Sequence, residues 1–252
     1  MSDPEGQEGR EEVRPPPRVK ICGLTHVEDV HHAAGAGADY LGFILTPGFG
    51  RSVPPEVAGR LVDAVATARV AVVVDEPPSA VARAAEAIEA SVIQLHGSEG
   101  PDEVEVLRRA GPWQMWKAVR ARSIEDVLRV VATYGDLVDG VLVEGWKRGV
   151  AGGGGVRLSV PAEQVRAAVR SPERLTQGMF VLAGGLTADN VADAVARFAP
   201  DVVDVSSGVE HRPGRKDPDQ VEAFLRAARG TADGPVPPTT ERPAIEPERN
   251  ED

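Results

Sequence analysis

Short, β-branched apolar runs alternate along this chain with longer alanine-rich stretches, and this alternation constrains the fold more than any other feature. The apolar runs predict eight strands, at 18–22, 40–45, 69–74, 91–95, 114–119, 138–143, 179–183 and 202–206. The stretches that follow them predict eight helices, near 26–37, 54–67, 78–90, 101–110, 123–134, 161–169, 188–198 and 217–229. Strands that are separated by helices pair in parallel through right-handed crossovers.

Two folds accommodate such an alternation. An open, doubly wound sheet would carry a Gly-x-Gly-x-x-Gly turn after its first strand, but the turn at 22–25 reads Cys-Gly-Leu-Thr, and the Gly-Ala-Gly at 35–37 precedes a strand. Eight strand–helix units in about 200 residues is the number that closes a barrel. We therefore expect an α/β chain with a single (β/α)8, or TIM, barrel, whose first helix starts with a capping box of Thr25 and Glu28.

The two ends of the chain differ in composition from the segment between them. Residues 1–17 hold five acidic residues and four prolines, and residues 230–252 hold six acidic residues and five prolines. Such segments bury too little apolar surface to offset the entropy that is lost when a chain becomes ordered. We expect disordered, acidic, proline-rich tails without a specific partner, around one barrel domain at 18–229.

Composition also limits what the chain binds and where it works. The absence of a run of 18 apolar residues, and of a basic N-terminus with an apolar stretch behind it, argues against a membrane span and a secretory signal. One cysteine, Cys22, excludes a disulfide framework and fits a reducing cytoplasm. The net charge of −11 argues against nucleic acid or a membrane surface as a partner. We expect a cytoplasmic monomer or homodimer.

Polar side chains gather where the predicted strands end, which is the face of such a barrel that carries chemistry. They are Lys20, Cys22, Arg51, Asp75, Gln94, His96, Lys117, Glu144, Asp204, Ser206 and Ser207. So many strands ending in polar side chains indicate an active site. No metal is expected, because His26, His31 and His32 lack the i, i+4 spacing of a helical metal site.

Three glycine-rich turns follow the last three strands. They contain the run 152–155 with Gly153 and Gly154, then Gly184 with Gly185, then Ser206-Ser207-Gly208. Without a Cβ, glycine lets backbone N–H groups approach an anion closely, and barrels often hold a phosphate between the last two loops. The run at 152–155 fits a flexible lid equally well. The turns after strands seven and eight predict a phosphorylated small-molecule substrate.

Several sequence blocks follow one another in the order of a known family. They are Val-Lys-Ile-Cys-Gly-Leu-Thr at 19–25, Leu-Gly-Phe-Ile at 41–44, Arg-Ser-Val at 51–53, Gln-Leu-His-Gly at 94–97, Leu-Ala-Gly-Gly-Leu at 182–186, Asp-Val-Ser-Ser-Gly-Val-Glu at 204–210 and Pro-Gly-Arg-Lys-Asp at 213–217. The chain thereby resembles the phosphoribosylanthranilate isomerase family of tryptophan biosynthesis over nearly all of 18–229.

This resemblance implies an Amadori rearrangement without a cofactor. N-(5-phosphoribosyl)anthranilate would become 1-(2-carboxyphenylamino)-1-deoxyribulose 5-phosphate. The resemblance implies that Cys22 is the general base, that Glu144 stands at the position of the family's general-acid aspartate, and that Arg51 grips the anthranilate carboxylate. Asp204 would hold the anthranilate nitrogen or order the site, and His96 would line it.

The implied reaction sets opposite demands on the base and the acid. An acid protonates the ribose ring oxygen as the ring opens to a Schiff base, and a base removes the proton from C2. A thiol is a weak base at neutral pH unless a cation favours the thiolate. Lys20 lies two residues before Cys22, on the same strand face, and can do so. Glu144 needs a raised pKa in a poorly solvated mouth.

The chain departs from the family pattern on one side of the predicted mouth. Glu144 replaces an aspartate, four glycines replace a Gly-Gly-x-Gly pattern, Val160 replaces an aromatic residue, and Asp75 replaces an asparagine. Because a displacement of about 1 Å can slow catalysis ~100-fold, a slower isomerase or an altered substrate choice is compatible with these changes. The alternative function is a non-catalytic or altered-specificity barrel that binds a related phosphorylated aminosugar, but a pure binder has no need of Cys22.

Overall fold

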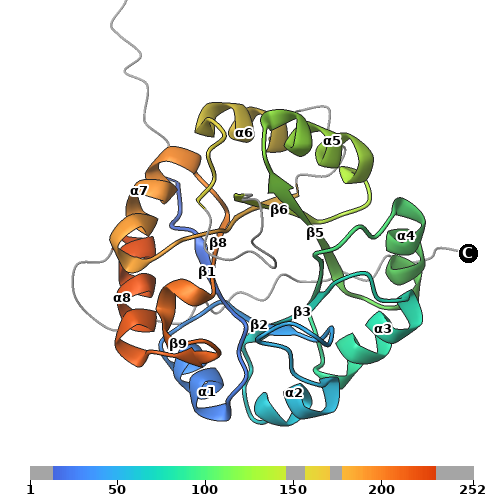
Figure 1. The fold of residues 1–252 in the computed structure, drawn as a ribbon, viewed down its shortest axis with the longest axis vertical. Coiled ribbons are helices and arrows are strands. Elements are labelled where there is room, and N and C mark those ends of the chain that lie inside the picture. Colours follow the sequence, from blue (N-terminus) through green and yellow to red (C-terminus); the bar gives the residue numbers. More distant parts are fainter. Residues whose placement is uncertain (1–13, 146–156, 171–177, 231–252) are drawn as a thin grey trace, which may run out of the picture.

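Eight parallel strands close into a barrel in chain order, with the helices around the outside, in a computed structural model that describes residues 14–145, 157–170 and 178–230 (Figure 1). The strands are β1 Arg18–Cys22, β2 Tyr40–Ile44, β3 Ala68–Val73, β4 Val92–Leu95, β5 Gln114–Ala121, β6 Gly140–Gly145, β7 Met179–Leu182 and β8 Val202–Val205. The helices are α1 Val27–Gly35, α2 Pro55–Leu61, α3 Pro78–Ala87, α4 Pro101–Ala110, α5 Ile124–Tyr134, α6 Ala162–Val169, α7 Ala188–Phe198 and α8 Pro218–Arg229. The predicted (β/α)8 barrel is confirmed.

A short insertion follows the last barrel strand. It consists of a 3-10 turn, η1 (Ser207–Val209), and a two-stranded hairpin, β9 (Glu210–Arg212) with β10 (Arg215–Lys216). The hairpin lies beside α1 and α8 in Figure 1. Thr25 ties the loop after β1 to this hairpin, since its hydroxyl donates to the carbonyl oxygen of Gly214 at 2.6 Å. The predicted capping role of Thr25 is therefore wrong, and His26 stands at the N-cap of α1 instead.

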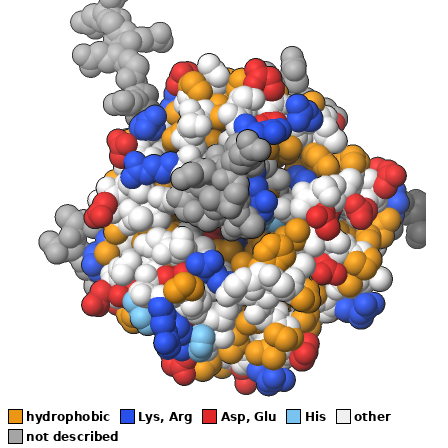
Figure 2. Space-filling view, in the orientation of Figure 1, with side chains coloured by type: hydrophobic (Ala, Val, Ile, Leu, Met, Phe, Trp, Pro, Cys, Tyr) orange, Lys and Arg blue, Asp and Glu red, His pale blue; other side chains and the backbone are white. Residues whose placement is uncertain are grey.

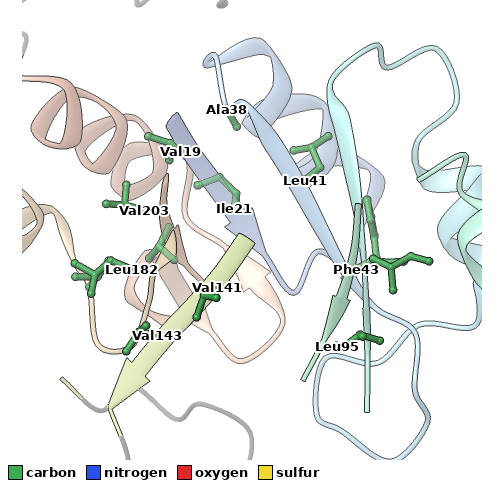
Figure 3. Close-up of a cluster of buried hydrophobic side chains, with 14 of the residues drawn as sticks. Val19, Ile21, Ala38, Leu41, Phe43, Leu95, Val141, Val143, Leu182 and Val203 are labelled. Carbon is green, nitrogen blue, oxygen red and sulfur yellow. The ribbon is translucent and has the colours of Figure 1, made fainter. Parts of the chain in front are cut away.

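Alternation along the strands gives the barrel two apolar cores. One face of each strand points outward and packs under the helices, as Val19, Ile21 and Leu41 do in Figure 3. The other face fills the barrel interior with Tyr40, Val70, Val72, Val92, Trp116, Leu142, Val181 and Val202. Because the period is two residues, the inward rows continue upward into Cys22, His96, Glu144 and Asp204, which brings these side chains to the C-terminal mouth.

The ends of the described chain bear on the predicted tails. Arg14 lies within the segment predicted as a tail, yet its guanidinium pairs with Asp201 at 2.8 Å. Gly230 ends α8 in the left-handed conformation, with φ 67°. Residues 1–13 and 231–252 lie outside the described residues, so disorder there stays a prediction. Within the described ranges, none of the helices combines the length and the apolar character that a bilayer crossing requires.

Candidate active site

A cavity of about 330 Å³ opens at the C-terminal ends of the barrel strands. The predicted site residues that line it are Cys22, Arg51, His96, Glu144, Gly184, Gly185, Asp204, Ser206, Ser207 and Gly208. Lys20 lies beneath the cavity, and Gly153 and Gly154 lie outside the described residues. Figure 2 shows basic, acidic and hydrophobic side chains around a hollow near the centre of this face.

Cys22 ends β1 and is buried against two charged side chains. Lys20, on the same strand, is wholly buried and forms an ion pair with Asp204 of β8, with 3.0 Å between Nζ and Oδ1. The register of the strands fixes this pair, because Lys20 and Asp204 stand opposite each other. Gly42 of β2 makes the room: a Cβ there would lie 2.9 Å from the Cys22 sulfur and 3.0 Å from Lys20 Cε.

The environment of Cys22 favours the neutral thiol. Burial raises the pKa of the thiol and the charge of Asp204 raises it further, while Lys20 and Lys216 lower it, and the net pKa lies above its ordinary value. The predicted influence of Lys20 is present, but burial outweighs it. Lys20 itself stays an ammonium ion, since Asp204 and Cys22 raise its pKa by more than burial lowers it.

Glu144 ends β6 and shares one carboxylate oxygen between two donors. His96 Nε2 lies 3.1 Å and Arg120 Nε lies 2.9 Å from Oε1 of Glu144. On its other side, the His96 ring places Nδ1 2.8 Å from the side-chain amide nitrogen of Gln94. An amide nitrogen donates, so this network assigns the ring proton to Nε2, facing Glu144.

The charge state of Glu144 corrects the sequence-based prediction. Burial raises the pKa of the carboxyl, but the hydrogen bonds and charges of His96 and Arg120 lower it by more, so the net pKa lies below the ordinary value. The poorly solvated position alone predicts a raised pKa. The carboxyl is as buried as predicted, but its two partners stabilise the carboxylate, which is therefore the resting form.

Arg51 is held at the mouth by Glu210. Its Nε and Nη2 atoms each lie 2.7 Å from a Glu210 oxygen, in a bidentate pair. Lys216 donates to the same carboxylate at 2.8 Å and to the Ser206 carbonyl oxygen at 3.1 Å. Glu210 takes the edge of the guanidinium formed by Nε and Nη2, so the second edge, formed by Nη1 and Nη2, can face a ligand.

The loops after β7 and β8 pack closely against each other. Gly184 and Gly185 have φ values of 92° and 63°, in the region that side chains disfavour. A Cβ at Gly208 would lie 1.9 Å from the Leu186 carbonyl oxygen, so only glycine permits this approach. The amide of Asn190 donates to the Gly185 carbonyl oxygen at 2.9 Å and fixes the first loop. Residues of both turns line the cavity.

Two polar residues from the predicted strand ends belong to a separate cluster. Lys117 points outward and pairs with Glu99 at 2.6 Å. Asp75 accepts hydrogen bonds from the backbone nitrogen and the hydroxyl of Ser98, at 2.6 and 2.8 Å. These contacts brace the loop that follows His96 and do not reach the cavity lining.

Three charged residues of the site have no role predicted from the sequence. Arg120 lines the cavity, but the predicted strand at 114–119 ends one residue before it, while the observed strand runs to Ala121. Glu210 and Lys216 lie in sequence blocks shared with the family, yet the contact of Glu210 with Arg51 joins residues 159 positions apart. A strand end extended by one residue would have found Arg120.

Comparisons with known proteins agree with this geometry. The model of a family described as N-(5'-phosphoribosyl)anthranilate (PRA) isomerase matches residues 19–227. An N-(5'-phosphoribosyl)anthranilate isomerase of Chromohalobacter salexigens is 41% identical over 210 residues, which cover 82% of this chain and 92% of that protein. One of Symbiobacterium thermophilum is 41% identical and covers 85% of this chain and 99% of that protein.

Solved structures give the same result. Phosphoribosyl anthranilate isomerase from Thermotoga maritima superposes with a TM-score of 0.71 at 31% identity, covering 85% of this chain and 99% of that one. A further structure, at a TM-score of 0.69 and 30% identity over the same shares, holds reduced 1-(o-carboxyphenylamino)-1-deoxyribulose 5-phosphate. The chain belongs to the N-(5'-phosphoribosyl)anthranilate isomerase family.

Proposed function

We propose that this chain catalyses the Amadori rearrangement of N-(5'-phosphoribosyl)anthranilate to 1-(2-carboxyphenylamino)-1-deoxyribulose 5-phosphate, a step of tryptophan biosynthesis. The observation that carries the proposal is that Cys22, from β1, and Glu144, from β6, line one cavity in a chain of this family. A solved relative holds the reduced form of this product. The cavity of about 330 Å³ is in the size range of small-molecule sites.

The proposed acid and base act on different atoms of the sugar. Glu144, once protonated, gives its proton to the ribose ring oxygen, so that the C1–O bond breaks and a Schiff base forms. The Cys22 thiolate takes the proton from C2, and the electron pair forms the enolamine. The enolamine then becomes the ketone as the C2 hydroxyl loses a proton and C1 gains one. One proton leaves the acid and one reaches the base, so the step balances without a cofactor.

The remaining residues of the cavity position the substrate. The N–H groups of the turns at 184–185 and 206–208 suit the 5'-phosphate, because glycine lets an anion approach the backbone. Arg51 offers a planar edge to the anthranilate carboxylate, and Glu210 keeps that edge oriented. Asp204 lines the cavity and pairs with Lys20 below it, which supports a role in holding the anthranilate nitrogen or in ordering the site.

The setting of the enzyme follows from its composition and family. We infer a cytoplasmic protein with no nucleic-acid or membrane partner, since the chain carries one thiol and a net charge of −11. We infer a monomer or a homodimer, and light scattering on the purified chain distinguishes the two.

Complementation tests the proposed function in cells. A tryptophan auxotroph that lacks phosphoribosylanthranilate isomerase should grow without tryptophan when it expresses this chain, and should not grow with Cys22→Ala. Immunoblots must show equal amounts of the two proteins. Absence of growth with well-expressed wild-type protein would count against the proposal. If the purified protein still bound the phosphorylated ligand, that result would favour the alternative of an altered-specificity barrel.

A further inference from the structure

Arg120 lines the cavity but has no part in the reaction as proposed above. It stands opposite Glu144 in the register between β5 and β6, and both side chains belong to the inward-facing rows. Its Nε donates to Glu144 Oε1 at 2.9 Å, and the residue lines the cavity. The register of the two strands thus brings the two side chains together.

This ion pair conflicts with the role of Glu144 as an acid. A general acid must hold a proton before the transition state, but a guanidinium within hydrogen-bonding distance favours the carboxylate. The other charged or titratable groups that face Glu144 from neighbouring elements are few among the described residues. His96 follows β4, and Cys22, Arg51 and Asp204 line the same cavity. On the other flank of β6, β7 is followed by the uncharged Ala183.

The two partners of Glu144 differ in how firmly they are held. His96 is fixed from behind by Gln94, which is 1% exposed. The Arg120 side chain is 34% exposed, against 5% for Glu144, and reaches the carboxylate through Nε. A guanidinium carries five N–H donors, so Arg120 can turn its remaining donors to another anion with little rearrangement. The proposed substrate brings two anionic groups, a carboxylate and a phosphate, into the cavity that Arg120 lines.

We propose that Arg120 is a positioning residue, an inference that rests on the proposed function. When the substrate binds, the Arg120 guanidinium leaves Glu144 and pairs with an anionic group of the substrate. Glu144 then keeps His96 as its neighbour, takes up one proton from solvent, and becomes the acid. The free enzyme holds its acid in the inactive, charged form, and substrate binding itself removes the cation that keeps it there. The trigger is the carboxylate or the phosphate, both of which are anions that a guanidinium binds through paired N–H donors.

Infrared difference spectroscopy detects the proton on Glu144. The probe is reduced 1-(o-carboxyphenylamino)-1-deoxyribulose 5-phosphate, added to the full chain at neutral pH. The C=O stretching band of a protonated carboxylic acid is expected to appear on binding, and to be missing in Glu144→Gln. Anthranilate alone and ribose 5-phosphate alone, added in separate samples, show which anionic group takes Arg120. A ligand-bound wild-type enzyme without this band contradicts the proposal.

Steady-state kinetics of Arg120→Gln give an independent readout. KM is expected to rise roughly tenfold or more, as for the loss of a charged hydrogen bond, while kcat changes less. The acidic limb of the kcat/KM profile is expected to move to higher pH, because Glu144 loses a cation in the free enzyme. Arg120→Lys keeps the charge and is expected to lie nearer to the wild type. Arg122→Gln, two residues along in a pair with Asp126 outside the cavity, is the matched control.

The outcomes separate this inference from the function on which it rests. If wild-type enzyme turns over the substrate, but Arg120→Gln leaves both KM and the acidic limb unchanged, the inference is wrong and the function stands. If Arg120→Gln lowers only kcat and the melting temperature, Arg120 has a structural role and the inference is again wrong. If wild-type enzyme neither binds the probe nor turns over the substrate, both fail together.

Discussion

Cys22 and Glu144 rest in the opposite charge states to those that the proposed mechanism needs. Burial holds Cys22 as a thiol, and His96 with Arg120 holds Glu144 as a carboxylate. The reactive pair is a thiolate with a carboxylic acid, which carries the same number of protons as the resting pair. In the free enzyme the ratio of the two forms therefore does not depend on pH between the two pKa values, and kcat/KM reports on a minor form of constant population.

This inversion predicts the shape of the pH profile. We expect kcat/KM to rise with pH up to the lowered pKa of Glu144, to stay level through neutrality, and to fall above the raised pKa of Cys22. The sign follows because below the first value the thiolate is lost and above the second the acid is lost. Initial rates across the pH range, with protein stability checked at each pH, measure the profile. A rate that peaks sharply near neutrality contradicts a resting thiol beside a resting carboxylate.

Gly42 is expected to be needed for catalysis, although it does not contact the substrate. A methyl group in Gly42→Ala would stand 2.9 Å from the Cys22 sulfur and 3.0 Å from Lys20 Cε, and both neighbours are buried. Because a displacement of about 1 Å can cost ~100-fold in rate, kcat should fall by about that factor while the chain still folds. Gly35→Ala is the control, since a Cβ there meets nothing within 4 Å. Equal kcat values for the two variants would contradict this role.

At the scale of the elements, most of what could be predicted from the sequence came from the strand periodicity and the glycine-rich turns. The period of two predicted that Lys20 and Cys22 share one face and that Asp204 ends a strand at the same mouth, while the contact of Asp204 with Lys20 came from the closed barrel. The pKa of Glu144 could not be predicted, because it depends on His96 and Arg120, which come from two other strands. The direction of this pKa shift can be predicted only when it is known which side chains meet at the mouth. A local sequence pattern does not hold that information.

The contacts between the loops could not be predicted from the sequence either. Glu210 accepts from Arg51, 159 positions earlier in the chain, and from Lys216 in the hairpin that follows it. The sequence blocks marked these residues as shared with a family, but a shared block does not say which atoms pair. Helix α2 shows a different failure: it ends at Leu61, well before the predicted 67, and Ala64 then adopts a left-handed conformation with φ 60°.

Glu210→Gln tests whether the hairpin orients the substrate through Arg51. The amide keeps the shape but loses the charge that holds Arg51 and Lys216. KM should rise roughly tenfold, in line with a charge-assisted hydrogen bond, and kcat should change less. Glu222→Gln, whose partner Arg226 is a surface neighbour on α8, is the control and should match the wild type. An unchanged KM in Glu210→Gln would show that Arg51 needs no anchor.

At the scale of the whole molecule, one barrel accounts for stability at its base and chemistry at its mouth. The inward rows begin as packed apolar side chains and end as charged ones, so the same strands build the core and the site. Residues 1–13 and 231–252 are outside the described residues. Their composition predicts that they add charge and no packing.

Removal of both end segments tests this division. A chain of residues 14–230 keeps Arg14, which pairs with Asp201, and Gly230, which ends α8. It is expected to match the full chain in kcat/KM and in Tm within about 2 °C, since surface changes away from packed contacts are usually within about 0.5 kcal/mol. Enzyme assays and thermal unfolding of both chains measure this. A large loss of either quantity would mean that an end segment packs on the barrel or reaches the mouth.

Turnover by purified enzyme decides whether the paired groups at the ends of β1 and β6 perform the proposed chemistry. N-(5'-phosphoribosyl)anthranilate is generated in situ, and its conversion is followed with wild-type protein, Cys22→Ala and Glu144→Gln. We expect wild-type turnover, and a loss of about 100-fold to 10,000-fold in kcat for each variant, the range for removal of a positioned acid or base. A wild-type protein without turnover, or a Cys22→Ala variant as fast as the wild type, would contradict the mechanism.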